Sequence, residues 1–153
     1  MSEHLPGVAG RRQRPDQWHV TLQFLGDVPE SRLPAVLDAG SAASGAAMAC
    51  DIAFDRLEYW KRPQVLCLAA GLAPEALVAL AGALRQELRR RGFTFDERPF
   101  RAHVTLVRGL GQRPPRPAFE PLVWPVHGYS LVQSMTERSG ARYVEIAAWP
   151  ARS

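Results

Sequence analysis

One tetrapeptide occurs twice in the chain, as His19-Val20-Thr21-Leu22 and as His103-Val104-Thr105-Leu106. Alternate side chains of a β-strand point to the same face, so each copy would place its histidine and threonine on one side and its valine and leucine on the other. The apolar pair suits a core, whereas the polar pair needs water, a partner or a substrate. Each copy lies in its own half of the chain, which is the spacing that a pseudo-twofold fold would need to bring both polar pairs to one groove.

A groove with two imidazoles and two threonine hydroxyls suits the chemistry of a phosphodiester. Imidazole has an unperturbed pKa near ~6.5, so one histidine can act as the base and the other as the acid near neutral pH. The hydroxyls can donate to phosphate oxygens, and Arg108 can add positive charge to the same anion. Because Arg108 lies at an odd offset from His103, we expect a bend at Gly109 or the strand end to bring it to the groove. The set favours hydrolysis or transesterification without a metal or another cofactor.

Other kinds of site have weaker support in the sequence. A metal site would need a third ligand beside His19 and His103, and no His-x-His or carboxylate cluster accompanies either motif. No G-x-S-x-G motif marks a serine nucleophile. A lone histidine on a strand is more often structural than catalytic. That is our interpretation of His4, near the start of the chain, and of His127, which has no matching threonine.

Length and composition predict an ordinary globular protein. The 153 residues are 46% hydrophobic and 22% charged, which predicts one domain over residues 1–153 and excludes a fully disordered chain. No apolar run approaches the ~20 residues that span a bilayer, and the start of the chain lacks the apolar stretch of a signal peptide, so we expect a cytoplasmic protein without membrane contact.

Cys50 and Cys67 sit singly in apolar segments, as buried thiols do. The net charge is +4, and every Lys or Arg except Lys61 is an arginine, which suits phosphate oxygens or reflects genome base composition.

The elements that must position the motifs form an α+β pattern of about six or seven strands and two helices. The first motif falls in a predicted strand over 18–25, and the second in one over 101–107. Apolar residues at helical spacing predict helices over 29–43 and from 74 to a stop at Gly92. Further strands are predicted over 49–59, 65–70, 122–135 and 143–149, with a loop over 109–117 and a hairpin turn at 138–141.

The paired H-x-T-L motifs and their flanks resemble the two-histidine phosphoesterases, and more narrowly the RNA 2′,3′-cyclic phosphodiesterases, first described as 2′-5′ RNA ligases. The resemblance runs from about Arg12 to Trp149, through RPDQWHVTLQFLGDVPESRL, YWKRPQVLCLAAG, PFRAHVTLVRGL and LVQSMTERSGARYVEIAAWP. It implies a bilobal fold with pseudo-twofold symmetry, in which antiparallel sheets surround a central groove and helices lie outside. Members of the family begin with an apolar strand and a helix before the first motif. Residues 1–18 carry neither pattern, so we expect the first family strand and helix to be missing here.

The resemblance also implies an activity and a role for each motif residue. The activity is hydrolysis of an RNA or nucleotide 2′,3′-cyclic phosphate end to a 2′-phosphomonoester, in some members with reversible 2′-5′ RNA ligation. By motif position, His19 would give a proton to the leaving 3′ oxygen and His103 would activate water. Thr21 and Thr105 would bind the phosphate, with Arg108 assisting.

Two other functions stay open on the sequence: an RNA-end or nucleotide binding module of the same fold with little turnover, and a phosphodiesterase for another small cyclic phosphate. Trp60 and Phe100 are candidate surfaces on which a base could stack, although aromatic residues are more often core. Arg62 and Arg101 are candidate contacts to backbone phosphates. We expect RNA with 2′,3′-cyclic phosphate ends or small cyclic nucleotides as partners, and a monomer.

Overall fold

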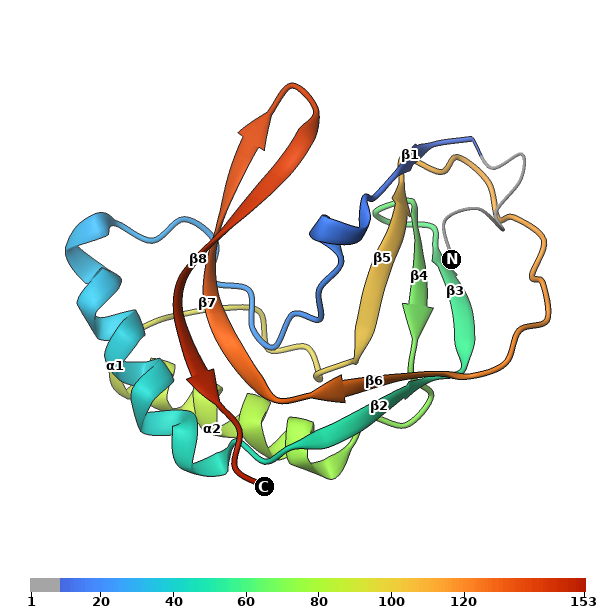
Figure 1. Cartoon of the computed structure of the whole chain (residues 1–153). Coiled ribbons are helices and arrows are strands. Elements are labelled where there is room, and N and C mark those ends of the chain that lie inside the picture. The colour runs from blue at the N-terminus through green and yellow to red at the C-terminus, as the bar shows by residue number, and fades with distance from the viewer. Residues whose placement is uncertain (1–8) are drawn as a thin grey trace.

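The structure is a computed structural model that describes residues 9–153. Its helices and strands are β1 Arg11–Arg12, α1 Leu33–Ala43, β2 Cys50–Phe54, β3 Arg56–Trp60, β4 Val65–Ala69, α2 Glu75–Arg90, β5 His103–Arg108, β6 Leu122–Val126, β7 Gly128–Glu137 and β8 Gly140–Pro150. Within the described residues the strands form one four-stranded antiparallel sheet, in the order β1-β5-β4-β3, and the antiparallel pairs β2-β6 and β7-β8. Figure 1 shows the four-stranded sheet standing apart from the long β7-β8 hairpin, with β2 and β6 between them at the base. This architecture is α+β, as expected.

The two predicted helices are present, and they pack against each other. In α2, Leu77, Leu80 and Leu88 are buried on one stripe, because leucines at helical spacing line up along one face. The helix ends just before Gly92, whose φ of +77° is a backbone conformation that favours glycine. Among the described residues, no helix is long and apolar enough to cross a bilayer.

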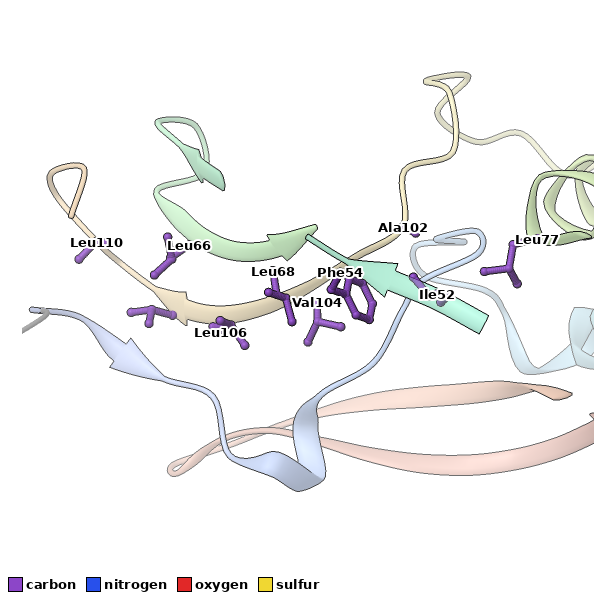
Figure 2. Packing of buried hydrophobic residues seen from close by; sticks show 10 residues of the cluster. Ile52, Phe54, Leu66, Leu68, Leu77, Ala102, Val104, Leu106 and Leu110 are labelled. Atoms are coloured by element: carbon purple, nitrogen blue, oxygen red, sulfur yellow. The ribbon is translucent and has the colours of Figure 1, made fainter. Parts of the chain in front are cut away.

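The core lies on one face of the four-stranded sheet. All residues of β4 are buried, as the continuous apolar run over 65–70 predicts for a strand between two others. Leu66 and Leu68 of β4 project to the same side as Val104 and Leu106 of β5 (Figure 2). There they meet Ile52 and Phe54 of β2 and Leu77 of α2. The opposite face of this sheet is free to carry polar side chains.

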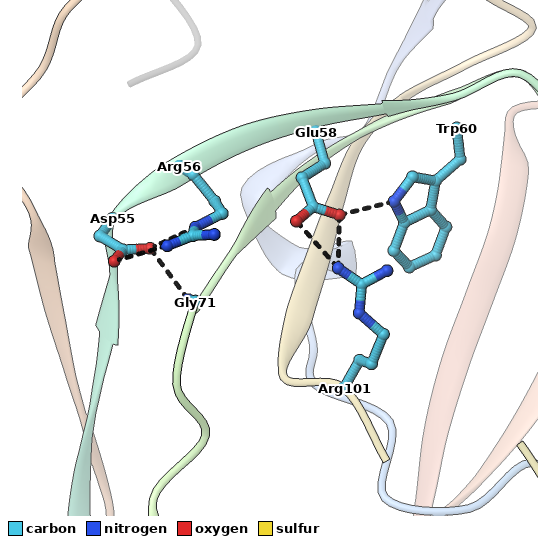
Figure 3. A network of polar contacts seen from close by, with 6 residues as sticks. All are labelled: Asp55, Arg56, Glu58, Trp60, Gly71 and Arg101. Carbon is cyan, nitrogen blue, oxygen red and sulfur yellow. Dashed lines mark hydrogen bonds and ion pairs between the residues drawn. The ribbon is translucent and has the colours of Figure 1, made fainter. Parts of the chain in front are cut away.

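Two predicted strands are each divided in the structure. The expected strand over 49–59 breaks at Asp55, whose Oδ1 accepts from the Gly71 backbone N–H at 2.9 Å (Figure 3). This break allows β2 to pair with β6 while β3 pairs with β4. The expected strand over 122–135 divides at His127, which separates β6 from β7. Alternation alone does not show where a chain leaves one sheet for another, so these boundaries were missed.

The prediction of a strand over 18–25 is wrong, because that segment is not part of a sheet. The chain pairs with β5 through β1 and through the Gln13 N–H, which donates to the Leu106 carbonyl at 2.8 Å. A short 3₁₀ turn over Pro15–Gln17 follows. Proline has no N–H to continue a ladder, so the chain leaves the ladder at this turn. The first motif therefore needs other contacts to hold it.

Candidate active site

The first motif lies in an extended segment that passes the core without joining a sheet. Trp18, Val20 and Leu22 pack against the apolar cluster of the four-stranded sheet. His19 is exposed and contacts Tyr143 of β8 rather than that cluster. The structure thus confirms the expected apolar side of this motif, although the segment is not a strand.

His19 is held by a hydrogen bond and a ring contact. Its Nδ1 lies 2.7 Å from the Gln17 carbonyl oxygen. A carbonyl only accepts hydrogen bonds, so Nδ1 must carry a proton, and Nε2 is left for chemistry. The Tyr143 ring, on β8, and the imidazole pack in an edge-to-face arrangement at 4.7 Å between centroids.

Gln17 ties this segment to the β7-β8 hairpin. This residue is only 6% exposed. Its Oε1 accepts from the Arg14 backbone N–H at 2.8 Å, and its Nε2 donates to the Ala141 carbonyl at 2.7 Å. The hairpin therefore supports His19 twice, through Tyr143 and through Gln17.

The second motif is built into β5 as predicted. Val104 and Leu106 are buried, while His103 and Thr105 are half-buried on the opposite face. His103 Nδ1 lies 2.8 Å from the Arg101 carbonyl oxygen, so this imidazole also carries its proton on Nδ1. The Trp60 ring, on β3, packs on His103 at 4.6 Å between centroids. The first and second motifs thus share one local design.

Glu58 holds Trp60 and Arg101, the two residues beside His103, and Figure 3 shows its contacts with both. Its carboxylate accepts from Arg101 Nη2 at 2.6 and 2.8 Å and from Trp60 Nε1 at 2.8 Å. The Arg101 guanidinium lies 5.2 Å from the centroid of the Trp60 ring. Arg101 is therefore tied to β3 by an ion pair and a cation–π contact, and its carbonyl orients His103.

A β-bulge brings Arg108 to the face that carries the motif. Leu66 of β4 pairs with Val107, but the next residue, Cys67, pairs with Thr105, so Leu106 is the extra residue of β5. This insertion restores the alternation and places Arg108 on the same face as Thr105. The expected bend at Gly109 or the strand end is thus replaced by a bulge inside the strand. The Thr105 Oγ1 lies 3.8 Å from the Cys67 Sγ, also on this face.

The electrostatics of the site favour a neutral His103. Burial lowers the pKa of His103, and the positive charges of Arg101 and His19 lower it further, against the opposing effects of the Arg101 carbonyl and the Glu58 carboxylate. Burial also raises the pKa of the Cys67 thiol to about 11, so this thiol stays protonated at neutral pH.

The remaining candidates divide into two groups. Trp60 and Arg101 lie beside His103, as described above. Phe100 packs against the apolar cluster, which fits the structural interpretation of this residue. Arg62 is exposed in the turn between β3 and β4, beyond the strand that carries Trp60.

Sequence reasoning missed Gln17, Glu58 and Tyr143. A signal existed for Gln17, which stands two residues before His19 as Arg101 stands two before His103. Glu58 likewise precedes Trp60 by two, so both side chains share one face of β3. Tyr143 gave no such signal, since its contact with His19 depends on how the hairpin folds back.

A separate hollow of about 260 Å³ lies on the apolar face of the sheet, lined in part by Trp18, Val104 and Trp124. Neither motif histidine lines it, so it is not the site of the proposed acid–base chemistry. Within residues 9–153, no three His, Cys, Asp or Glu side chains are grouped so that they could hold a metal ion.

The sequence is similar to a known family of phosphoesterases. The family model described as LigT like Phosphoesterase matches residues 1–67. The RNA 2′,3′-cyclic phosphodiesterase of Escherichia coli (strain K12) is 32% identical over 149 residues, which cover 95% of this chain and 82% of that protein. A protein of the same name from Thermus thermophilus is 29% identical over 154 residues, covering 90% of this chain and 74% of that one.

Solved structures show the same arrangement of elements. The crystal structure of E. coli LigT complexed with 3′-AMP matches with a TM-score of 0.84 at 29% identity, over 99% of this chain and 87% of that one. The crystal structure of TT0787 of Thermus thermophilus matches with a TM-score of 0.83 at 27% identity, over 99% and 87% of the respective chains. With this fold, and with a relative that is 32% identical over 95% of this chain, the chain belongs to the LigT-like phosphoesterase family.

Proposed function

We propose that this protein hydrolyses 2′,3′-cyclic phosphate ends of RNA or nucleotides to 2′-phosphomonoesters, with His19 and His103 as the acid and the base. The observation that carries the proposal is the matched state of the two imidazoles. Each donates Nδ1–H to the carbonyl two residues earlier, and each keeps Nε2 for the reaction. The names of the E. coli and T. thermophilus relatives support this choice of substrate.

The proposed reaction balances with the groups of this chain. Neutral His103 takes a proton from water at Nε2, and the water oxygen forms a bond to phosphorus. The bond between phosphorus and the 3′ oxygen breaks, and protonated His19 gives its Nε2 proton to that oxygen. The product is a 2′-phosphomonoester with a free 3′ hydroxyl. The Thr21 and Thr105 hydroxyls donate to the non-bridging oxygens, on which negative charge develops, and the Arg108 guanidinium assists by its positive charge from beside them.

The lowered pKa of His103 fits the role of base, because a base must be neutral before it accepts a proton. The groups named here all come from one chain, so a monomer suffices for the proposed reaction. Trp60 offers a face on which the base of the substrate can stack, next to the imidazole.

The test is turnover of a nucleoside 2′,3′-cyclic phosphate in EDTA, with identification of the hydroxyl that keeps the phosphate. We expect the 2′-phosphate as product, and a loss on the order of 100-fold or more in kcat for His19→Ala and for His103→Ala. His127→Ala is the matched control, because His127 is exposed between β6 and β7. Near-wild-type turnover by both motif variants would show that the acid and base are assigned wrongly.

The same assay separates the alternatives. Binding of a 2′,3′-cyclic end without product over hours would favour a binding module for RNA ends. Faster turnover of another small cyclic phosphate, compared side by side, would favour that substrate. Incubation of one RNA that ends in a 2′,3′-cyclic phosphate with a second RNA that begins with a 5′ hydroxyl tests for 2′-5′ ligation.

A further inference from the structure

Two arginines face each other across adjacent strands next to the proposed catalytic residues. Arg11 of β1 is the direct cross-strand partner of Arg108 of β5. Paired residues of antiparallel strands share a face, so Arg11 lies on the face that carries His103, Thr105 and Arg108. The neighbour Arg12 pairs with buried Val107 and belongs to the opposite face.

The position of the Arg11 guanidinium supports the same placement. A Cβ atom added to Gly140, at the start of β8, would lie 3.6 Å from Arg11 Nη1 and 3.4 Å from Gln17 Nε2. The guanidinium therefore reaches from the sheet toward the hairpin that also supports His19. Gly10 lets the backbone before Arg11 approach β5 closely. Its φ is +122°, and a Cβ there would lie 2.9 Å from the Arg108 carbonyl oxygen.

The charge of this arginine pair is not balanced by a neighbouring acid. The acidic side chains of the region have other partners: Asp16 pairs with Arg14 at 3.1 Å, Glu137 with Arg142 at 3.5 Å, and Glu58 with Arg101 at 2.6 Å. No ion pair recorded among residues 9–153 includes Arg11 or Arg108. Like charges placed directly opposite each other in a sheet are destabilising, and an anion between them would relieve the repulsion.

We propose that Arg11 and Arg108 together form a subsite for the phosphate on the 5′ oxygen of the terminal nucleotide, so that the enzyme prefers ends with a phosphate at that position. The inference rests on the proposed function, which places the cyclic phosphate beside Thr105. Same-face residues of a strand are about 7 Å apart, and the bulge adds slightly to the step from Thr105 to Arg108. A nucleotide likewise carries its 5′ phosphate one ribose away from its cyclic phosphate. Guanidinium groups bind phosphate oxygens through paired hydrogen bonds, which suits this role.

The test compares Arg11→Gln with the wild type on three substrates: a nucleoside 2′,3′-cyclic phosphate, the same compound with a 5′-phosphate, and a dinucleotide that ends in the cyclic phosphate. For both substrates with a phosphate at the 5′ oxygen, kcat/KM of Arg11→Gln should be about tenfold below the wild type, since a charged hydrogen-bond donor is removed. The nucleoside substrate, which has no such phosphate, should be unchanged. Arg12→Gln is the matched control, because it removes the same charge from the other face of β1, and it should leave all three rates unchanged.

Each contrary result overturns the inference. An equal loss on all three substrates would place Arg11 on the reacting phosphate or in the folding of β1. Equal rates for variant and wild type would show that no phosphate contacts Arg11. A loss on the dinucleotide alone would point to the upstream nucleoside instead. If the wild type turns over none of them, the proposed function fails. The subsite is then decided by calorimetry of nucleoside 2′-phosphates with and without a 5′-phosphate. Arg11→Gln should weaken binding of the ligand that carries the 5′-phosphate and leave binding of the other unchanged.

Discussion

The two histidine motifs have the same local contacts but different supports. In both, Nδ1 of the histidine donates to the carbonyl two residues earlier, and an aromatic ring of another element packs on the imidazole. His103 stands in β5, where backbone pairing with β4 fixes its position. His19 stands in a segment outside the sheets, held by side chains and by the β7-β8 hairpin.

This difference shows that a histidine side chain can be held in one orientation without standing in a strand. A fixed tautomer needs one acceptor at Nδ1, and both motifs supply it from the local backbone. What differs is the element that holds that backbone: hydrogen bonds of a sheet for His103, and one buried glutamine for His19. The first motif should therefore depend more on single side chains than the second.

The sharpest test of this difference is the pair Gln17→Ala and Arg101→Ala. Each variant removes the side chain that stands two residues before a motif histidine. Gln17→Ala leaves the Ala141 carbonyl and the Arg14 N–H without their partner, and we expect kcat to fall about tenfold or more because a small displacement of a reacting group is costly. Arg101→Ala removes a partly exposed ion pair but leaves the β4-β5 pairing, and kcat should fall less than about threefold.

Two controls separate positioning from stability in that experiment. Gln13→Ala removes another buried glutamine of the same segment, and it should lower stability without lowering kcat to the same extent. The ¹⁵N chemical shifts of the His19 ring report which nitrogen carries the proton. They should show loss of the Nδ1–H tautomer in Gln17→Ala only. Equal losses of kcat in Gln17→Ala and Arg101→Ala would show that the sheet gives His103 no advantage.

A smaller effect is expected from the aromatic partners of the two histidines. Contacts between aromatic rings are worth ~0.5–1.5 kcal/mol, so Tyr143→Leu and Trp60→Leu should each lower kcat by about twofold to tenfold. Trp60→Leu should also raise KM if the base of the substrate stacks there, whereas Tyr143→Leu should leave KM unchanged. Tyr143→Phe keeps the ring edge that contacts His19 and should behave as the wild type. A change in KM for Tyr143→Leu alone would reverse the two roles.

Local patterns predicted what depends on neighbours in the sequence. The repeated tetrapeptide indicated the chemistry, the apolar run over 65–70 indicated a buried strand, and the spacing of leucines indicated α2. Each of these follows from alternation or helical spacing within a few residues. The division into a polar and an apolar side was confirmed for the second motif for the same reason, and the apolar side was confirmed for the first.

The supports of the first motif depend on contacts between distant segments, and the sequence did not indicate them. The bond from Gln17 to Ala141 joins residues 124 positions apart. The bulge at Leu106 follows from the register between β4 and β5, which cannot be counted from β5 alone. The 3₁₀ turn at Pro15 takes the first motif out of the sheet although its alternation is that of a strand.

The smallest expected effect is a shift in pH dependence, and it reports which role His103 has. The Glu58 carboxylate raises the pKa of His103 and the Arg101 guanidinium lowers it. Glu58→Gln removes a negative charge that favours the protonated ring, so the pKa of His103 should fall below its wild-type value. Arg101→Ala removes a positive charge, so the pKa should rise.

If His103 is the base, Glu58→Gln moves the acidic limb of the kcat/KM profile to lower pH, and the variant keeps activity in acid where the wild type loses it. If His103 is instead the acid, the alkaline limb moves to lower pH and activity at neutral pH falls. Profiles of the two single variants that move the same limb in opposite directions would assign His103 to one role, and profiles that do not move would show that neither charge acts on the reacting ring.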